Sequence, residues 1–199
     1  MYPFIETIRL IDGKFRNVEF HNERVKNTFM KFYPDHEPHD LKAITNQLGR
    51  IGNGRVRVLY NSERLKFSIS TIFNSKTTHY QLVESPRLRY DFKYYDRLSL
   101  VHTQQQDGSY IEPVFCRNGM ITDTSRANLI FREGSKWYTP DTFLLNGCMR
   151  QSLLSLGYIQ STPIHRSELN RFNGFKLINA LNHPDEVEEH DISLLLQTK

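Results

Sequence analysis

The sequence predicts a mixed α+β protein with two lobes, because strand pairs and helical patterns alternate along the chain. Two apolar runs meet at Asp12-Gly13, a dipeptide typical of a tight hairpin turn. Residues 79–90 are extended and interrupted by Pro86, as expected of a crossing between lobes. We therefore expect a small lobe at residues 1–85 and a larger lobe at residues 86–199.

The small lobe is predicted to contain a hairpin, two helices and a second hairpin. Residues 4–20 form the first hairpin, and residues 21–33 show helical spacing that Pro34 ends. Residues 39–51 favour a second helix, and residues 54–73 alternate as two joined strands.

The larger lobe is predicted to combine short strands with separate helices. Gly147 and Gly157 bracket one of these helices, and Ser167 is the expected cap of another. The predicted elements are a helix at 93–106, three strands in 110–140, a helix at 147–158, a strand and helix in 162–172, a buried strand at 175–181 and a terminal helix at 192–199.

Composition indicates a soluble globular protein. The 199 residues are 38% hydrophobic and 24% charged, without a run of about 20 apolar residues that would span a bilayer. The start of the chain shows no secretory signal pattern. Cys116 and Cys148 lack metal-ligand spacing, so we expect reduced thiols, a cytoplasmic location and no metal site.

The net charge of +4 is compatible with an anionic partner. Because acidic and basic residues are interspersed, the pattern favours a small phosphorylated or carboxylated ligand over nucleic acid.

Four residues could carry chemistry. Lys93 lies among aromatic residues, which could lower its pKa and make it a nucleophile, or it could be a surface lysine. Gly147 opens a helix whose start could bind an anion, and Arg24 could join it or lie on a solvated helix face. Asp123 could cap a turn, pair with Arg126 or serve a ligand.

Together these residues match the requirements of pyridoxal phosphate. A lysine can form a Schiff base with the aldehyde, a helix start and an arginine can hold the phosphate, and a carboxylate can keep the ring nitrogen protonated. This combination gives Asp123 a candidate role.

Five stretches, in order, resemble motifs of the fold type IV aminotransferases, the family of branched-chain and D-amino-acid transaminases and 4-amino-4-deoxychorismate lyase. Residues 4–29 resemble the opening hairpin and its H-x-x-R helix, and residues 92–97 resemble the lysine segment. Residues 119–131 are similar to the T-E-x-x-x-x-N strand, residues 138–154 to the phosphate-binding helix start, and residues 177–184 to the N-[AS]-L turn.

The resemblance implies a D-amino-acid aminotransferase-like fold and a role for each matching residue. Lys93 would be the catalytic, cofactor-bound lysine. The implied cofactor-binding residues are Arg24, Lys93, Asp123, Asn128, Gly147, Cys148, Met149, Asn179 and Ala180.

Three features depart from the family pattern. Asp123 stands where the family usually has Glu, one methylene longer. The chain begins at the family's second strand, so we expect an N-terminally shortened fold. The loop at residues 60–67 lacks the glycines usual in the lyases.

The resemblance favours 4-amino-4-deoxychorismate lyase in the folate pathway, acting on a small-molecule amine as a cytoplasmic homodimer. The alternatives are an amino-acid transaminase for branched-chain or D-amino acids, a pyridoxal phosphate-binding relative without turnover, and a basic α+β binding module. No nucleic acid or membrane partner is expected.

Overall fold

The computed structural model describes residues 1–45, 47–48, 52–72, 77, 79–100 and 110–196. Its contacts group the chain into two compact units. Unit 1 comprises residues 1–74 and 92–96, and unit 2 comprises residues 75–91 and 97–199. The partition predicted from the sequence differs from this one, because it assigns Lys93 to the C-terminal lobe whereas contacts group residues 92–96 with unit 1.

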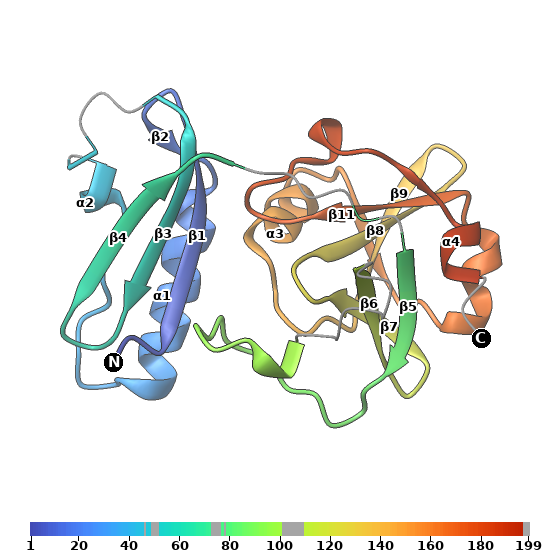
Figure 1. Ribbon diagram of the computed structural model, residues 1–199, viewed down its shortest axis with the longest axis horizontal. Coiled ribbons are helices and arrows are strands. Elements are labelled where there is room, and N and C mark those ends of the chain that lie inside the picture. Colours follow the sequence, from blue (N-terminus) through green and yellow to red (C-terminus); the bar gives the residue numbers. More distant parts are fainter. Residues whose placement is uncertain (46, 49–51, 73–76, 78, 101–109, 197–199) are drawn as a thin grey trace. The chain divides into compact units, whose positions relative to one another are not determined.

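Unit 1 is a four-stranded antiparallel sheet with one long helix on one face (Figure 1). The sheet order is β2-β1-β3-β4, and residues Asp12 and Gly13 make the turn between β1 and β2 with positive φ angles. The bounds are β1 Phe4–Ile11, β2 Lys14–Phe15, α1 Val18–Phe32, α2 Lys42–Thr45, β3 Gly54–Tyr60 and β4 Leu65–Ser70.

Helix α1 forms because its buried positions recur every three or four residues. Val18, His21, Val25 and Phe29 all face inward, and the helix ends before Pro34, as predicted. The strands supply the other half of this core through alternate residues such as Ile8, Val56 and Val58.

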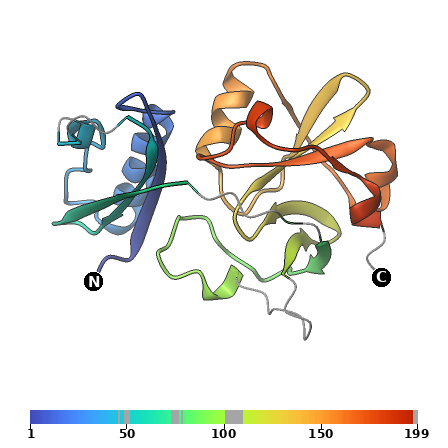
Figure 2. The same cartoon turned by 45° about the horizontal axis from the view of Figure 1, so that its top comes forward.

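Unit 2 is built on a mixed sheet of eight strands. Six of them follow the order β10-β9-β8-β7-β6-β5, and the other two, β11 and β12, join this sheet because β11 pairs with β8. Helices α3 and α4 lie at opposite ends of this unit (Figures 1 and 2). The strands are β5 His79–Glu84, β6 Ile111–Arg117, β7 Met120–Thr124, β8 Asn128–Glu133, β9 Lys136–Pro140, β10 Gln160–Thr162, β11 Gly174–Ile178 and β12 His190–Asp191. The helices are α3 Cys148–Ser155, α4 Ser193–Leu196 and the 3-10 helices Leu98–Leu100, Arg166–Arg171 and Pro184–Glu186.

The structure corrects three expectations in unit 2. Residues 110–140 form four strands, because residues 125–127 break the middle run. The helix expected at 93–106 is represented only by the 3-10 turn at 98–100, and residues 101–106 lie outside the described residues. The cap of the 3-10 helix at 166–171 is His165, whose ring accepts a hydrogen bond from the backbone of Ser167.

The second helix of unit 1 is also shorter than expected. Only residues 42–45 are helical, and residues 46 and 49–51 of the predicted range are outside the described part. Among the described residues, no helix has the length and apolar character needed to cross a bilayer.

Candidate active site

Asp123 holds the turn that precedes α3. Its Oδ2 accepts hydrogen bonds from the backbone N–H groups of Leu144 and Leu145, both at 2.9 Å. Its Oδ1 accepts from Asn128 Nδ2 at 2.8 Å. The sequence left three roles open for Asp123: it could cap a turn, pair with Arg126 or serve a ligand. In the structure Asp123 caps a turn, which lies more than 20 residues further along the chain.

Asn128 connects the same carboxylate to Gly147. Its Nδ2 also donates to the Leu145 carbonyl at 2.9 Å, so one amide group bridges the strand end and the turn. A Cβ atom added at Gly147 would overlap Asn128 Oδ1. Glycine is therefore required at the start of α3 by close packing, since its backbone angles of −66° and 142° are open to any residue.

Burial raises the pKa of Asp123 to about 6, although hydrogen bonds from Leu145, Asn128 and Leu144 act in the opposite direction. Desolvation disfavours the charged carboxylate, and only part of that cost is offset by the three donors. At neutral pH the group is therefore mainly ionised, with a proton affinity well above that of an ordinary aspartate.

Arg126 pairs with Glu112 and not with Asp123. Arg126 Nε lies 2.9 Å from Glu112 Oε2, and the fully buried Glu112 also accepts from the backbone and hydroxyl of Ser125. Asn179 Nδ2 donates to the Arg126 carbonyl at 3.3 Å. These bonds join the loop at residues 125–127 to the turn that follows β11.

The Asn179 turn is closed by its own side chain. Asn179 Oδ1 accepts from the backbone of Leu181 and Asn182 at 3.0 and 3.2 Å. Because Asn128 pairs with Ile178 across β8 and β11, the turn carrying Asn179 and Ala180 begins beside Asn128.

Arg150 adds a buried positive charge to the first turn of α3. It donates to the Pro140 carbonyl at 2.9 Å and to Asn146 Oδ1 at 3.1 Å, and it lies 4.5 Å from the centre of the Phe143 ring. Burial lowers the pKa of Arg150, while Asp123 raises it. The helix start in unit 2 thus combines a cation and the helix dipole, both of which favour an anion.

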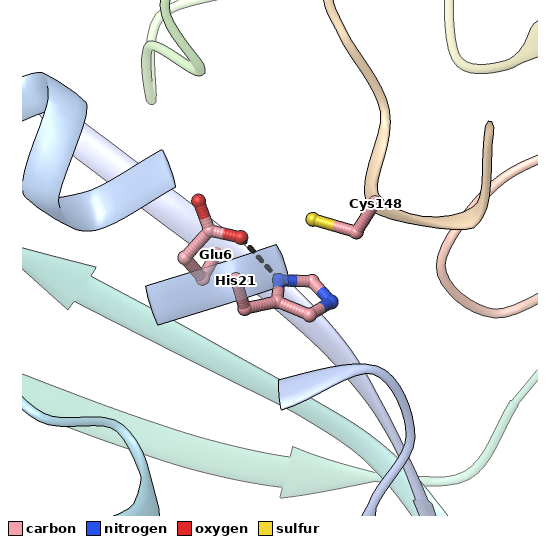
Figure 3. Close-up of side chains that lie close together, drawn as sticks. All are labelled: Glu6, His21 and Cys148. Atoms are coloured by element: carbon pink, nitrogen blue, oxygen red, sulfur yellow. Dashed lines mark hydrogen bonds and ion pairs between the residues drawn. The ribbon is translucent and has the colours of Figure 1, made fainter. Parts of the chain in front are cut away.

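In unit 1, Arg24 belongs to a buried cluster with Glu6 and His21. Arg24 Nε and Nη2 donate to the two carboxylate oxygens of Glu6 at 2.8 and 2.5 Å, and His21 Nδ1 lies 2.5 Å from Glu6 Oε2 (Figure 3). This bidentate pairing fixes the plane of the guanidinium group. Cys148, also labelled in Figure 3, is the first residue of α3 in unit 2.

The cluster keeps Glu6 ionised. Burial alone would raise its pKa, but the charge of Arg24 and the hydrogen bonds from Arg24 and His21 lower it to about 2. Because the carboxylate can then only accept, His21 Nδ1 must be the donor in their hydrogen bond.

Lys93 lies at the edge of the unit 1 sheet and not in a helix. Its carbonyl accepts from the backbone N–H of Ile5 at 3.0 Å, and Tyr94 forms an antiparallel bridge with Phe4. The side chain is half-buried, between a half-buried Phe92 and Tyr94. The two aromatic neighbours of Lys93 in the sequence are therefore half-buried, as Lys93 itself is.

The hydrogen bonds and strand pairs of unit 2 bring together seven of the predicted site residues, namely Asp123, Asn128, Gly147, Cys148, Met149, Asn179 and Ala180. Arg24 and Lys93 belong to unit 1. The sequence interpretation missed Glu6, Glu112 and Arg150. The first two could have been noticed as acids within apolar strand patterns, "FIETI" and "YIEPVF", where a carboxylate needs a partner.

The chain matches known proteins over almost its whole length. The family model described as amino-transferase class IV matches residues 4–183. An uncharacterized protein from Haemophilus influenzae is 35% identical over 187 residues, which cover 92% of this chain and 99% of that relative.

Solved structures share the fold. A crystal structure from Haemophilus somnus, assigned provisionally as a 4-amino-4-deoxychorismate lyase, has 30% identity and a TM-score of 0.83, covering 92% of this chain and 98% of that one. The 4-amino-4-deoxychorismate lyase of Pseudomonas aeruginosa has 15% identity and a TM-score of 0.70 over 95% of this chain and 81% of that one. A hypothetical aminotransferase from Mycobacterium tuberculosis in its PLP-bound form has 15% identity and a TM-score of 0.68, with coverages of 95% and 79%. At 15% identity, the last two show a common fold only.

Proposed function

The chain belongs to the class IV aminotransferase family, and we propose that it is a pyridoxal 5'-phosphate-dependent 4-amino-4-deoxychorismate lyase. The reaction would release the enolpyruvyl substituent of the substrate as pyruvate and leave 4-aminobenzoate. The relative from Haemophilus somnus supports the choice of reaction. The observation that carries the proposal is the hydrogen-bonded connection from Asp123 through Asn128 to the start of α3.

The residues of unit 2 fit the cofactor. An ionised carboxylate has about four acceptor positions, and Asp123 uses three of them. One position on Oδ1 therefore remains for a ring N–H group. Asn128 Oδ1 occupies the space that a Cβ atom at Gly147 would need, so a glycine fits at this helix start. The backbone N–H groups at the start of a helix suit a phosphate group.

Lys93 and Asp123 would have separate roles in the reaction. When bound, the cofactor supplies an electron sink for negative charge on the substrate carbon. Lys93 would attach the cofactor and then move protons to and from that carbon. Asp123 would hold the proton on the ring nitrogen.

The phosphate would be held by Arg24, oriented by Glu6, and by the backbone of Gly147, Cys148 and Met149. Asn128, Asn179 and Ala180 would complete the site. Asn128 would do so by packing on Gly147, and the Asn179 turn by its position beside Asn128.

Cofactor attachment can be tested without turnover. Protein mixed with pyridoxal phosphate should develop a visible absorption band, and borohydride reduction should fix the cofactor on Lys93, located by peptide mass spectrometry. Lys93→Ala should abolish both signals, whereas Lys31→Ala, which changes an exposed lysine in the last turn of α1, should leave them unchanged. Unaltered trapping in Lys93→Ala would contradict the proposal.

The reaction class needs a second assay. Pyruvate release from 4-amino-4-deoxychorismate, followed with lactate dehydrogenase, should be lost in Lys93→Ala. Amino transfer from a branched-chain or D-amino acid to 2-oxoglutarate, without pyruvate release, would instead identify a transaminase. Cofactor attachment with neither reaction would identify a relative without turnover, and no attachment would leave a binding module.

A cytoplasmic homodimer forms part of the same proposal and is supported by the family. Sedimentation of the cofactor-loaded protein should give twice the mass of the 23.5 kDa chain.

A further inference from the structure

Glu112 is a fully buried carboxylate to which the proposed reaction gives no role. It lies in β6, and its Oε1 accepts hydrogen bonds from the backbone N–H and the hydroxyl of Ser125 at 2.9 and 2.6 Å. Arg126 Nε lies 2.9 Å from its Oε2. A buried charge is costly unless it is paired and hydrogen-bonded, so these partners indicate what Glu112 serves. Each of these contacts is with the loop at residues 125–127.

The turn in this loop closes without Glu112. Thr124 N–H donates to the Ala127 carbonyl at 2.9 Å, and Ala127 N–H donates to the Thr124 hydroxyl at 3.1 Å. These bonds join residues three apart in the chain, so they depend little on where the turn lies. Glu112 instead reaches the loop from the neighbouring strand β6. Its contacts therefore fix the position of the loop relative to β6.

This loop lies between two candidate cofactor residues and touches a third. It joins Asp123 to Asn128, which face each other as the pair between β7 and β8. The Arg126 carbonyl accepts from Asn179 Nδ2 at 3.3 Å, and the side chain of Asn179 also closes its own turn. A continuous set of contacts thus runs from Glu112 through Arg126 to the Asn179 turn.

Further partners restrict the same loop within unit 2. The Tyr110 hydroxyl lies 3.2 Å from Ser125 Oγ, and the Arg126 guanidinium lies 5.5 Å from the centre of the Tyr110 ring. Arg97, which follows the Lys93 segment in the chain, donates to the Ser125 carbonyl. Glu112 is the buried anion among these groups and balances the charge of Arg126. Loss of one partner of such a pair leaves the other charge uncompensated, so the arrangement depends on the carboxylate.

From these contacts we propose that Glu112 is a positioning residue of the cofactor site, which fixes residues 125 and 126 and thereby holds the Asn179 turn in place for pyridoxal phosphate. The inference rests on the proposed function, in which Asn179 and Ala180 complete that site. It adds a residue that touches neither cofactor nor substrate. When a site is correctly formed only part of the time, the apparent dissociation constant rises in inverse proportion to that fraction.

Glu112→Gln weakens these contacts without changing the size of the side chain. An amide offers one acceptor oxygen and one NH2 group where the carboxylate offers two acceptors. An NH2 group at the Oε2 position would face Arg126 Nε, and at the Oε1 position it would face the N–H of Ser125. In either orientation a donor meets a donor, and the negative charge beside Arg126 is lost.

Hydrogen exchange and cofactor titration together provide the test. In cofactor-free Glu112→Gln, mass spectrometry should show backbone exchange at residues 179–182 accelerated by about tenfold, the effect of losing a charge-assisted hydrogen bond. Titration of the visible absorption band should show a dissociation constant for pyridoxal phosphate raised by about tenfold.

Glu84→Gln is the matched control. The Glu84 carboxylate accepts from the backbone N–H groups of Asn118 and Gly119 at 2.6 and 3.2 Å, in the turn that precedes β7. The same substitution is thus made at the opposite end of β7 from the 125–127 loop. It should change exchange at residues 179–182 and the dissociation constant by less than about twofold, as expected of a site that is not coupled to them.

Unchanged exchange at residues 179–182 in Glu112→Gln that circular dichroism shows to be folded would overturn the inference. Faster exchange with an unchanged dissociation constant would also overturn it, because Glu112 would then only stabilise the fold. If Glu112→Gln does not fold, Ser125→Ala removes one bond to the carboxylate and should shift both measurements in the same directions; no shift in either would overturn the inference.

Reductive trapping on Lys93 of the unsubstituted protein is read separately. Failure of trapping would refute the proposed function. Intact trapping together with a dissociation constant that Glu112→Gln leaves unchanged would refute only the positioning role of Glu112.

Discussion

Gly147→Ala tests whether the start of α3 is packed as tightly as the structure indicates. The backbone angles at Gly147 are accessible to alanine, so the cost comes from the overlap of the new methyl group with Asn128 Oδ1. Asn128 must then move and lose its hydrogen bonds to Asp123 and to the Leu145 carbonyl.

The magnitude follows from those two bonds. A hydrogen bond to a charged acceptor contributes about 1.5–3 kcal/mol and one to a neutral carbonyl about 1 kcal/mol. Gly147→Ala should therefore lower the free energy of unfolding by about 2.5–4 kcal/mol, or the melting temperature by roughly 5–15 °C for a chain of this size.

The assay is urea unfolding followed by fluorescence of Trp137, which lies in β9 of unit 2 and is the single tryptophan of the chain. In an Asn128→Ala background the overlap is removed, so adding Gly147→Ala should cost less than about 0.5 kcal/mol. Gly52→Ala is the control, because no atom of the described residues lies within 4 Å of its added Cβ. Equal costs of Gly147→Ala in the presence and absence of Asn128 would refute the reasoning.

Two buried carboxylates should give opposite pH responses. Burial raises the pKa of Asp123 from 3.8 to about 6. At pH values between these two, the folded state holds a proton on Asp123 that the unfolded state has released. Stability of unit 2 should therefore fall by about 3 kcal/mol as pH rises from 4 to 6, and Trp137 fluorescence should show that Asp123→Asn removes this slope. The pKa of Glu6 is lowered from 4.5 to about 2, so its stabilisation of unit 1 is present above pH 4.5 and lost as pH falls towards 2. Glu6→Gln leaves Arg24 without its buried counter-charge and should cost about 3–5 kcal/mol, measured as faster hydrogen exchange in α1 and β1; unchanged protection would show that Arg24 is stabilised otherwise.

Much of the architecture was predictable from local patterns. The Asp12-Gly13 hairpin, helix α1 ending before Pro34, and helix α3 between Gly147 and Gly157 all follow from periodicity and turn residues. The break between β7 and β8 at residues 125–127 was not predicted, because the strands on both sides of it are apolar. Ser125 in this break donates two hydrogen bonds to Glu112, which lies on another strand, β6.

The motif residues were identified by resemblance, but their contacts were not. The sequence left three roles open for Asp123, and the structure gives it the backbone of Leu144 and Leu145 together with Asn128. Arg24 was identified as a cation, but its orienting partner Glu6 was not, because the two residues lie 18 positions apart in the chain and meet only when α1 packs on β1.

The sequence by itself determined the Asp12-Gly13 hairpin, helices α1 and α3 and the identity of the chemical groups, since these depend on residues close together in the chain. Only the tertiary structure decided which carboxylate Arg24 and Arg126 meet, what Asp123 holds, and that the backbone of Lys93 bonds to Ile5 at the edge of the unit 1 sheet. The physical reason is that strand register and burial join groups far apart in sequence, and a buried charge takes its role from the partners that surround it.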